Sequence, residues 1–308
     1  KLKEIETGTV QCVVTSPPYW GLRYYGTAEW EGGDENCNHM SAKEKSRYDY
    51  KNIGIQSGSK GTDAPRWKAK CPDCGANKID NQLGLEKTPE EYVEKMVEVF
   101  RQIKRVLKHD GTVWLNLGDS YNGSGKGAWD KTDVQKEVYV PPKGTPVTRV
   151  KSLKPKDLVG IPWRVAFALQ ADGWYLRQDI IWHKPNPMPE SVRDRCTKSH
   201  EYIFLLSKSA RYFYDAESIR EPINLNNNGS IRSPKFGKDR PKNPREMNEV
   251  IYDEIKGANK RSVWTINTKP YKDAHFAVFP PKLPELCIKA GSSEGDVVLD
   301  PFFGSGTT

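Results

Sequence analysis

The tetrapeptide SPPY at residues 16–19 follows directly on an apolar run, residues 10–14, that predicts a buried strand. Two consecutive prolines fix the backbone and remove two N–H donors, so this corner is rigid and rich in hydrogen-bond acceptors. The Ser16 hydroxyl and the Pro17 carbonyl can both accept hydrogen bonds, and the Tyr19 ring offers an apolar surface beside them. Taken alone, the tetrapeptide is also compatible with an ordinary turn.

A second stretch with chemical potential, DPFFGSGTT, occupies residues 300–308 and follows an expected strand at residues 296–299. An acidic residue at the end of a strand, followed by a glycine-rich turn, is typical of cofactor sites in α/β proteins. Glycines allow a ligand to approach the backbone N–H groups closely. The dinucleotide pattern GxGxxG is not completed, so the stretch indicates a cofactor loop without identifying the cofactor.

Four residues offer the ligand types of a tetrahedral zinc site: Cys37, His39, Cys71 and Cys74. The segment CPDCG has the spacing of a zinc knuckle, and Gly75 allows its tight turn. We predict a structural site, because four protein ligands leave no open position for water. The alternatives are reduced surface cysteines beside an unrelated histidine, and a redox pair of Cys71 and Cys74, for which no thioredoxin-like context is present.

Short apolar runs that alternate with helical patterns predict the frame that positions these stretches. Buried parallel strands are expected at residues 10–14, 112–117, 177–182, 202–206 and 296–299. Helices are expected at residues 88–108, 157–171 and 281–291. The first helix begins with a threonine cap, a proline and two glutamates, and its apolar residues recur at spacings of three and four. The alternation predicts an α/β fold with a parallel sheet.

The composition excludes some classes of protein. The 308 residues have a mean hydropathy of −0.75, and no apolar stretch approaches the roughly 18 residues that a membrane-spanning helix needs. The first residues have no apolar signal-peptide core, and the six cysteines do not form a secreted disulfide framework. We therefore expect a cytoplasmic protein without a membrane association.

The charge of the chain favours a polyanionic partner. The formal net charge is +8 and the isoelectric point is near 9.0. Residues 231–245 concentrate basic side chains among three prolines, so they predict an exposed loop. The residues that we expect to contact DNA are Arg232, Lys235, Lys238, Arg240, Lys242 and Arg245. A solvated linker is the alternative for this segment.

Taken together, SPPY and DPFFGSGTT resemble motifs of the amino-methyltransferases of DNA, which transfer a methyl group from S-adenosylmethionine to an exocyclic nitrogen of a base. In that family a [D/N/S]PP[Y/F] tetrapeptide forms the catalytic corner, and a DPFxGSGTT stretch forms the cofactor loop. The catalytic motif comes first here, as in the permuted beta group of the family. Residues 275–280 resemble the segment that closes over the methionine end of the cofactor, and residues 182–189 with 200–201 resemble the family's middle section.

The resemblance implies a class I methyltransferase-like, Rossmann-like fold with a mostly parallel sheet. The implied core comprises residues 1–28, 83–220 and 263–308. Residues 29–82 are then a zinc-stabilised insertion, and residues 221–262 are a loop-rich target-recognition region. Long polar segments of this kind inside a compact domain need a function or a stabiliser of their own.

The resemblance also implies roles for individual residues. The implied catalytic residues are Ser16, Pro17, Pro18 and Tyr19. The implied cofactor-binding residues are Asp300, Pro301, Phe302, Gly304, Ser305, Gly306, His275 and Phe279. Two acceptors at the N–H groups of a base would localise the nitrogen lone pair, which is otherwise delocalised into the ring. The target nitrogen is inaccessible in a stacked pair, so the base must be extruded, and Tyr19 can stack on it.

Serine at the first motif position favours N4 of cytosine, since relatives that act on N6 of adenine more often carry aspartate there. The adenine enzyme is the first alternative. A non-catalytic zinc-containing DNA-binding protein on the same fold is the second, and both intact motifs argue against it. A methyltransferase of protein or RNA is the third, but similar enzymes of that kind usually have the cofactor motif first.

The partners implied by the family are double-stranded DNA and, in a restriction–modification pair, a cognate restriction endonuclease. We expect a monomer or homodimer of prokaryotic or phage origin. In the family a Gly-Asp strand precedes the catalytic motif, and an acidic residue that holds the cofactor ribose follows the glycine loop. Neither is present between Lys1 and Thr308, so we expect the sequence to be part of a longer protein.

Overall fold

The computed structural model describes residues 2–21, 29–39, 70–71, 73–79, 81–122, 153–222, 257–269, 279–304 and 306–308. The chain divides into two compact units. The first, the sheet unit, comprises residues 1–16, 99–117 and 169–308. The second unit comprises residues 17–98 and 118–168. The division of the chain into a core, an insertion and a target-recognition region stays a prediction.

The sheet unit is built on a six-stranded sheet in the order β7-β5-β6-β4-β1-β8. The strands are β1 Val10–Thr15, β4 Leu107–Leu117, β5 Tyr175–His183, β6 His200–Ser207, β7 Val263–Thr265 and β8 Val297–Leu299. Strand β1 pairs parallel with β4 and β8, and β5 pairs parallel with β7. The mostly parallel α/β sheet predicted from the sequence is therefore confirmed.

Strand β6 is the exception, because it runs antiparallel to both of its neighbours, β4 and β5. The expectation of a parallel strand at residues 202–206 is therefore wrong in direction. The connection from β5 to β6, residues 184–199, contains no helix. Parallel neighbours need a crossover connection that is usually helical, whereas a strand that returns directly beside its predecessor pairs antiparallel.

In the described part of the chain, three helices accompany the strands: α2 Pro89–Val106, α4 Ile161–Ala171 and α6 Lys282–Gly291. Two short 3-10 helices, η1 Leu2–Glu4 and η2 Glu217–Ile219, also lie there. The start of α2 follows the prediction, because the N–H of Glu91 donates to Thr88 Oγ1 at 3.2 Å and the Glu91 carboxylate accepts from the N–H of Lys87 at 3.0 Å. Thr88 therefore caps the helix, as predicted, and Glu91 also holds the residue that precedes the cap.

Helix α4 begins at Ile161, four residues after the predicted start at residue 157. Gly160 has a φ of +78°, which a right-handed helix does not accommodate. The carboxylate of Asp119 accepts from the N–H groups of Gly160 and Ile161 at 3.0 and 3.1 Å. A side chain distant in sequence thus supplies the cap, and sequence periodicity does not reveal it.

Helix α2 leads directly into β4, whereas the sequence predicted a helix to residue 108 and a strand only from residue 112. Gly111 lies inside the strand, and a Cβ there would come within 2.6 Å of Leu107 Cγ and 2.9 Å of the Gln11 carbonyl oxygen. The register between β1 and β4 is irregular at this point, between Val10 and Cys12. The glycine therefore permits a close approach of two strands, not a chain reversal.

Three short strands were not predicted, namely β7 and the hairpin of the second unit. That hairpin pairs β2 Glu29–Glu31 with β3 Asn77–Ile79 in antiparallel register. Strands of three residues show too little alternation for sequence patterns to detect.

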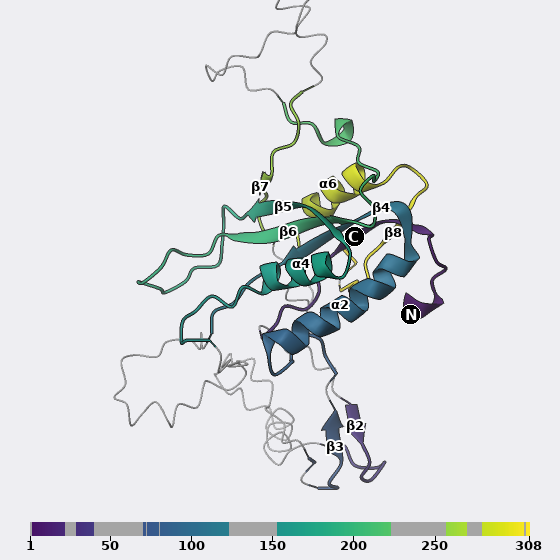
Figure 1. Cartoon of the computed structure of the whole chain (residues 1–308). Helices are drawn as coiled ribbons and strands as arrows, with labels where there is room; N and C mark the ends of the chain where they lie inside the picture. The colour runs from purple at the N-terminus through teal and green to yellow at the C-terminus, as the bar shows by residue number, and fades with distance from the viewer. Residues whose placement is uncertain are drawn as a thin grey trace, which may run out of the picture. The chain divides into compact units, whose positions relative to one another are not determined.

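The core of the sheet unit lies between the sheet and α6, which Figure 1 shows on one side of the strands. Its buried members include Cys12, Trp114, Trp182, Trp264, Leu283 and Cys287. At the end of α6, a Cβ on Gly291 would come within 2.8 Å of Cys12 Sγ and Trp114 Nε1. The last turn of α6 therefore lies directly on the sheet. None of the helices among the described residues is long and apolar enough to cross a membrane.

We predict that Gly291→Ala lowers the free energy of unfolding by about 1–3 kcal/mol, because the added methyl group overpacks the contact between α6 and the sheet. The measurement is the urea midpoint at constant m-value. Lys289→Ala on the exposed side of the same helix is the control and should change the free energy by no more than about 0.5 kcal/mol. An unchanged midpoint for Gly291→Ala would show that the helix can shift away from the sheet without cost.

Candidate active site

Both motifs predicted to act in catalysis lie at one edge of the sheet. Ser16 directly follows β1, and Asp300 directly follows β8. These strands are parallel neighbours, so their carboxyl ends meet at the same edge. In open α/β sheets this is the edge at which ligands bind. Ser16 is half-buried there.

The Asp300 carboxylate ties the glycine-rich loop to β1. Its Oδ1 accepts from Thr15 Oγ1 at 2.5 Å and from the N–H of Phe302 at 3.0 Å. Its Oδ2 accepts from Thr308 Oγ1 at 3.0 Å. Both oxygens are thus engaged within the protein, and hydrogen bonds to a carboxylate are among the stronger ones. Asp300 shapes the loop and holds it beside Ser16.

The loop after Asp300 depends on two glycines. Gly304 and Gly306 have φ values of +52° and +73°, in the left-handed region that favours glycine. The N–H of Gly306 donates to the Phe303 carbonyl at 2.8 Å, and a Cβ on Gly306 would come within 2.7 Å of the Phe303 ring. The loop is therefore a tight turn that no other residue at position 306 would allow without rearrangement.

The SPPY corner continues into the second unit, where several contacts hold it. The Tyr92 hydroxyl donates to the Pro18 carbonyl at 3.0 Å. The Tyr19 ring lies directly against Gly118, since a Cβ there would come within 2.6 Å of Tyr19 Cε2. A Cβ on Gly84 would come within 2.9 Å of the Tyr19 carbonyl oxygen. Two glycines and a tyrosine therefore fix Pro18 and Tyr19 within the second unit.

The next residue, Trp20, anchors the corner and was not predicted to take part. Its ring is buried, and its Nε1 donates to the Glu86 carbonyl at 3.1 Å. The Glu86 carboxylate, almost completely buried, accepts from the N–H of Gly84 at 2.8 Å and pairs with Lys95 at 3.0 Å. Gly21 donates to the Gly84 carbonyl at 2.8 Å. An aromatic residue directly after SPPY was the signal available in the sequence.

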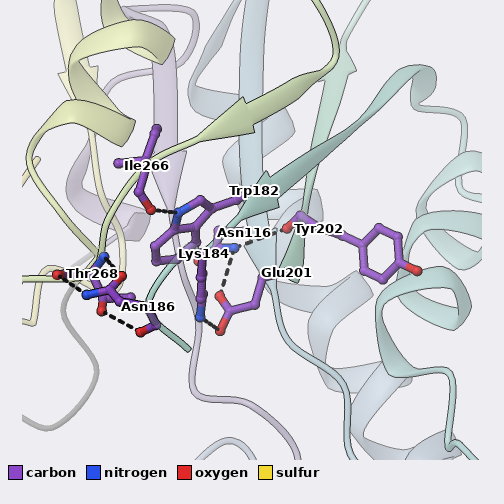
Figure 2. A network of polar contacts seen from close by, with 8 residues as sticks. All are labelled: Asn116, Trp182, Lys184, Asn186, Glu201, Tyr202, Ile266 and Thr268. Carbon is purple, nitrogen blue, oxygen red and sulfur yellow. Dashed lines mark hydrogen bonds and ion pairs between the residues drawn. The ribbon is translucent and has the colours of Figure 1, made fainter. Parts of the chain in front are cut away.

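A polar network extends the same sheet edge to β4, β5 and β6 (Figure 2). Asn116 is 2% exposed, and its Nδ2 donates to Glu201 Oε2 at 3.2 Å and to the Tyr202 carbonyl at 3.1 Å. Lys184 forms an ion pair with the other oxygen of Glu201. The Lys184 ammonium also lies 4.2 Å from the centre of the Trp182 ring. Charges that are largely shielded from water are stable only when paired in this way.

These three polar residues, Asn116, Lys184 and Glu201, were not among the predicted site residues. Asn116 interrupts an otherwise apolar run, TVWLNL, and that interruption was the signal in the sequence. The pairing of Lys184 with Glu201 follows from the register of β5 and β6, in which His183 lies opposite His200.

The four predicted metal ligands lie together in the second unit. Their ligand atoms all lie within 4.8 Å of one another. The distance between Cys37 Sγ and Cys71 Sγ is 3.8 Å, and that between Cys74 Sγ and His39 Nδ1 is 3.4 Å. Zinc bonds of about 2.3 Å to sulfur and about 2.0–2.1 Å to nitrogen give tetrahedral edges of about 3.8 and 3.5 Å. The arrangement therefore fits a zinc ion.

The local backbone explains this arrangement. The N–H of Cys71 donates to the Ala76 carbonyl at 2.7 Å, and the N–H of Gly75 returns to the Cys71 carbonyl at 2.9 Å. Gly75 has a φ of +75°, as the predicted tight turn requires. The backbone N–H groups of Ala76 and Asp34 lower the pKa of Cys74 to about 6, which favours the thiolate that binds metal.

Some predicted site residues lie in the core or outside the described residues. Phe279 is 8% exposed and belongs to the apolar core beside α6. Pro301 and Phe302 are half-buried in the glycine-rich loop. His275, Ser305 and the six basic residues from Arg232 to Arg245 lie outside the described residues.

Comparisons with known proteins place the chain in a family. The model of a family described as DNA methylase, comprising N6 and N4 methyltransferases, matches residues 10–308. The chain belongs to this DNA amino-methyltransferase family. It is 43% identical to the Type II methyltransferase M.SmaI of Serratia marcescens over 307 residues, which cover 99% of this chain and 76% of that protein. It is 42% identical to M.XycI of Xanthomonas campestris pv. cyanopsidis, over 99% of this chain and 74% of that protein.

The fold agrees with a solved structure. The structure of the PvuII DNA methyltransferase, titled cytosine-N4-specific, superposes with a TM-score of 0.51 and 16% sequence identity. The match covers 100% of this chain and 72% of that one. The predicted family, the class I methyltransferase fold and a place in Type II DNA modification are confirmed. The methyl donor of this DNA amino-methyltransferase is S-adenosylmethionine, as predicted.

We predict that Glu201→Gln lowers the free energy of unfolding by about 1–3 kcal/mol, because it leaves the Lys184 charge without its partner in a site with less than one-fifth exposure. Adding Lys184→Met should recover part of this loss. A double-mutant cycle from urea unfolding measures the coupling, which we expect to lie between about 0.5 and 3 kcal/mol. Strictly additive losses would show that the ion pair contributes nothing to stability.

Proposed function

We propose that the protein methylates N4 of cytosine in double-stranded DNA and that the SPPY corner is its catalytic centre. The observation that carries this proposal is the hydrogen bond from Thr15 to Asp300, within one compact unit. It places the residue before Ser16 in contact with the first residue of the glycine-rich loop. The proposed methyl acceptor site and the proposed cofactor loop are therefore neighbours at one sheet edge.

The proposed roles follow from the acceptors in the corner. The Ser16 hydroxyl and the Pro17 carbonyl accept the two N–H hydrogens of the target amino group, so that the nitrogen lone pair turns toward the methyl group. The Pro18 carbonyl is committed to Tyr92 and does not serve in this way. The Tyr19 ring stacks on the extruded base. Holding nitrogen, methyl carbon and sulfur in line contributes to the rate through proximity and orientation.

S-adenosylmethionine supplies an electrophilic methyl group when it is bound. The residues proposed to hold it are those of the loop from Asp300 to Gly306, whose glycines leave the backbone open to a ligand. His275 is proposed to lie at its methionine end. Since the Asp300 carboxylate is already engaged by Thr15, Phe302 and Thr308, its proposed role is to hold the loop in shape.

The choice of cytosine is supported by Ser16, because a neutral hydroxyl stands where adenine-specific relatives more often have a carboxylate. N6 of adenine is an amino group of the same chemistry, so the experiment must identify which base is methylated.

The protein would be incubated with plasmid DNA and S-adenosylmethionine that carries tritium in its methyl group, and the digested nucleosides would be separated. N4-methylcytosine is expected, N6-methyladenine would overturn the choice of base, and no labelled base would overturn the activity.

We predict that Ser16→Ala lowers kcat by about 100-fold or more while the Kd for DNA changes little, because the lost acceptor acts only on the reacting nitrogen. The measurement is single-turnover methyl transfer together with fluorescence anisotropy of labelled DNA. Ser293→Ala, in the exposed turn before β8, is the matched control and should behave as the wild type. Near-normal turnover of Ser16→Ala would exclude the corner as the active site.

We also propose that Cys37, His39, Cys71 and Cys74 hold a structural zinc ion. The distances support it, as do the knuckle turn and the small hairpin of β2 and β3 around it. The His39 ring also stacks on Trp30 with 4.9 Å between centres. Among the described residues of the insertion, only Cys71 and Ala76 are buried apolar side chains, so a metal would replace a core there.

We predict that the purified protein contains about one zinc ion per chain and that Cys74→Ser loses it. Elemental analysis by mass spectrometry provides the measurement, and hydrogen exchange should rise over residues 29–39 and 70–79 in the variant. Cys196→Ser, at an exposed cysteine outside the cluster, is the control. Equal zinc content in both variants would contradict the site.

Further parts of the proposal concern the partner and the setting. Residues 29–82 and 221–262 are proposed to recognise the target sequence, and the basic residues between Arg232 and Arg245 to contact phosphates. The net charge of +8 supports an affinity for DNA that falls steeply with salt. A cognate restriction endonuclease as functional partner and a cytoplasmic location complete the proposal, supported by the Type II relatives of bacterial origin.

A further inference from the structure

The β5–β6 loop, residues 184–199, leaves the sheet at the carboxyl end of β5 (Figure 1). Strand β5 runs in the same direction as β1, so this is the edge that carries Ser16 and Asp300. Strand β5 ends at His183, and β6 begins opposite it at His200. The N–H of Lys184 donates to the Ser199 carbonyl at 2.7 Å and continues the ladder into the loop. The β5–β6 loop therefore projects from the candidate active-site edge within the same compact unit.

The root of the β5–β6 loop is held in place by side chains. Asn186 Nδ2 donates to the Thr268 carbonyl at 3.1 Å, and the N–H of Thr268 donates to Asn186 Oδ1 at 3.0 Å, as Figure 2 shows. Lys184 is paired with Glu201 at the same root. These contacts join the start of the loop to the segment that follows β7.

The first part of the β5–β6 loop is also stiff for reasons of sequence. In the segment KPNPMP, every second residue from Pro185 to Pro189 is a proline. Each of the other residues, Lys184, Asn186 and Met188, precedes a proline and is restricted to extended backbone. Prolines also fix their own φ, so little conformational entropy remains to be lost on binding.

The second part of the loop is braced by a carboxylate. Glu190 Oε2 accepts from Arg195 Nη1 at 2.7 Å and from the N–H of Lys198 at 3.2 Å. The Arg195 guanidinium holds the pKa of Glu190 below its usual value. The loop thus has internal contacts on both sides of its exposed residues.

Met188 stands between these two braces and is 84% exposed, more than any other large apolar side chain among the described residues. The braces and prolines hold this apolar side chain in a fixed place before any partner binds, so little entropy is lost on contact. The loop contains four basic residues, Lys184, Arg193, Arg195 and Lys198, against two acidic ones, Glu190 and Asp194. This surplus of positive charge around an apolar tip suits a polyanion with an apolar interior.

We propose that the β5–β6 loop contacts duplex DNA and that Met188 is a wedge that enters the base stack beside the extruded base. The inference rests on the proposed function. Methionine is among the apolar side chains that proteins insert between base steps, where they offset the cost of unstacking. The exposed Arg193 then lies among the phosphates of the same DNA segment.

The dimensions of the sheet agree with this placement. Two strands, β6 and β4, separate β5 from β1, so the root of the loop lies about 14 Å from the end of β1. Met188 is the fifth residue after His183 and can reach about 17 Å from the strand end. This reach exceeds the separation of the two strand ends, so Met188 can approach the base stack next to a base held at Ser16.

The test compares Met188→Ala with the wild type on two duplexes. One contains the site that the wild-type protein methylates, mapped beforehand by sequencing methylated plasmid, and the other has a mismatch opposite the target base. A mismatched base costs less to extrude, so a wedge matters less there. We expect Met188→Ala to lower kcat/KM about tenfold on the matched duplex and less than about twofold on the mismatched one. Met188→Leu should stay within about threefold of the wild type on both.

Val297→Ala is the matched control, since Val297 is an exposed apolar residue at the opposite, amino end of β8. It should leave both rates unchanged. Equal losses for Met188→Ala on the two duplexes, or no loss on either, would overturn the wedge while the proposed function stands. A wild-type protein that methylates no DNA would instead overturn the proposed function and the wedge with it.

Discussion

The hydrogen bond between Thr15 and Asp300 joins two strand ends from opposite parts of the chain. The parallel pairing of β1 with β8 brings these ends to the same edge, and the Asp300 carboxylate then fixes the loop that follows. A carboxylate can do this because it accepts several hydrogen bonds at once. Strand pairing thus sets the common edge, and this contact fixes the glycine-rich loop beside Ser16.

The same edge carries the polar network of Asn116, Lys184 and Glu201. Its groups are largely shielded from water, where charges are tolerated only as hydrogen-bonded pairs. The direction of β6 makes this network possible, because an antiparallel strand begins at the edge where its neighbours end. The β5–β6 loop, with its exposed Met188, starts from that network and extends the edge toward the DNA in our proposal.

The second unit contains a polar segment, the β2–β3 hairpin, that has little apolar core of its own. Around the hairpin of β2 and β3, three thiols and an imidazole converge, while few apolar side chains are buried. The SPPY corner in this unit is instead held by direct packing, with Gly84 and Gly118 against Tyr19 and the Tyr92 hydroxyl on Pro18. Close packing thus holds the corner, whereas in our proposal a zinc ion orders the hairpin.

The sequence by itself determined the features that depend on local spacing: the SPPY and DPFFGSGTT motifs, the capped start of α2, the knuckle CPDCG and the α/β alternation. Only the tertiary structure decided the direction of β6, the start of α4 at the Asp119 carboxylate, and the partners of Asp300 and Glu201. The physical reason is that each of these joins residues that are distant along the chain. Their strength comes from geometry that exists only once the strands have paired, and no local pattern of residue types encodes it.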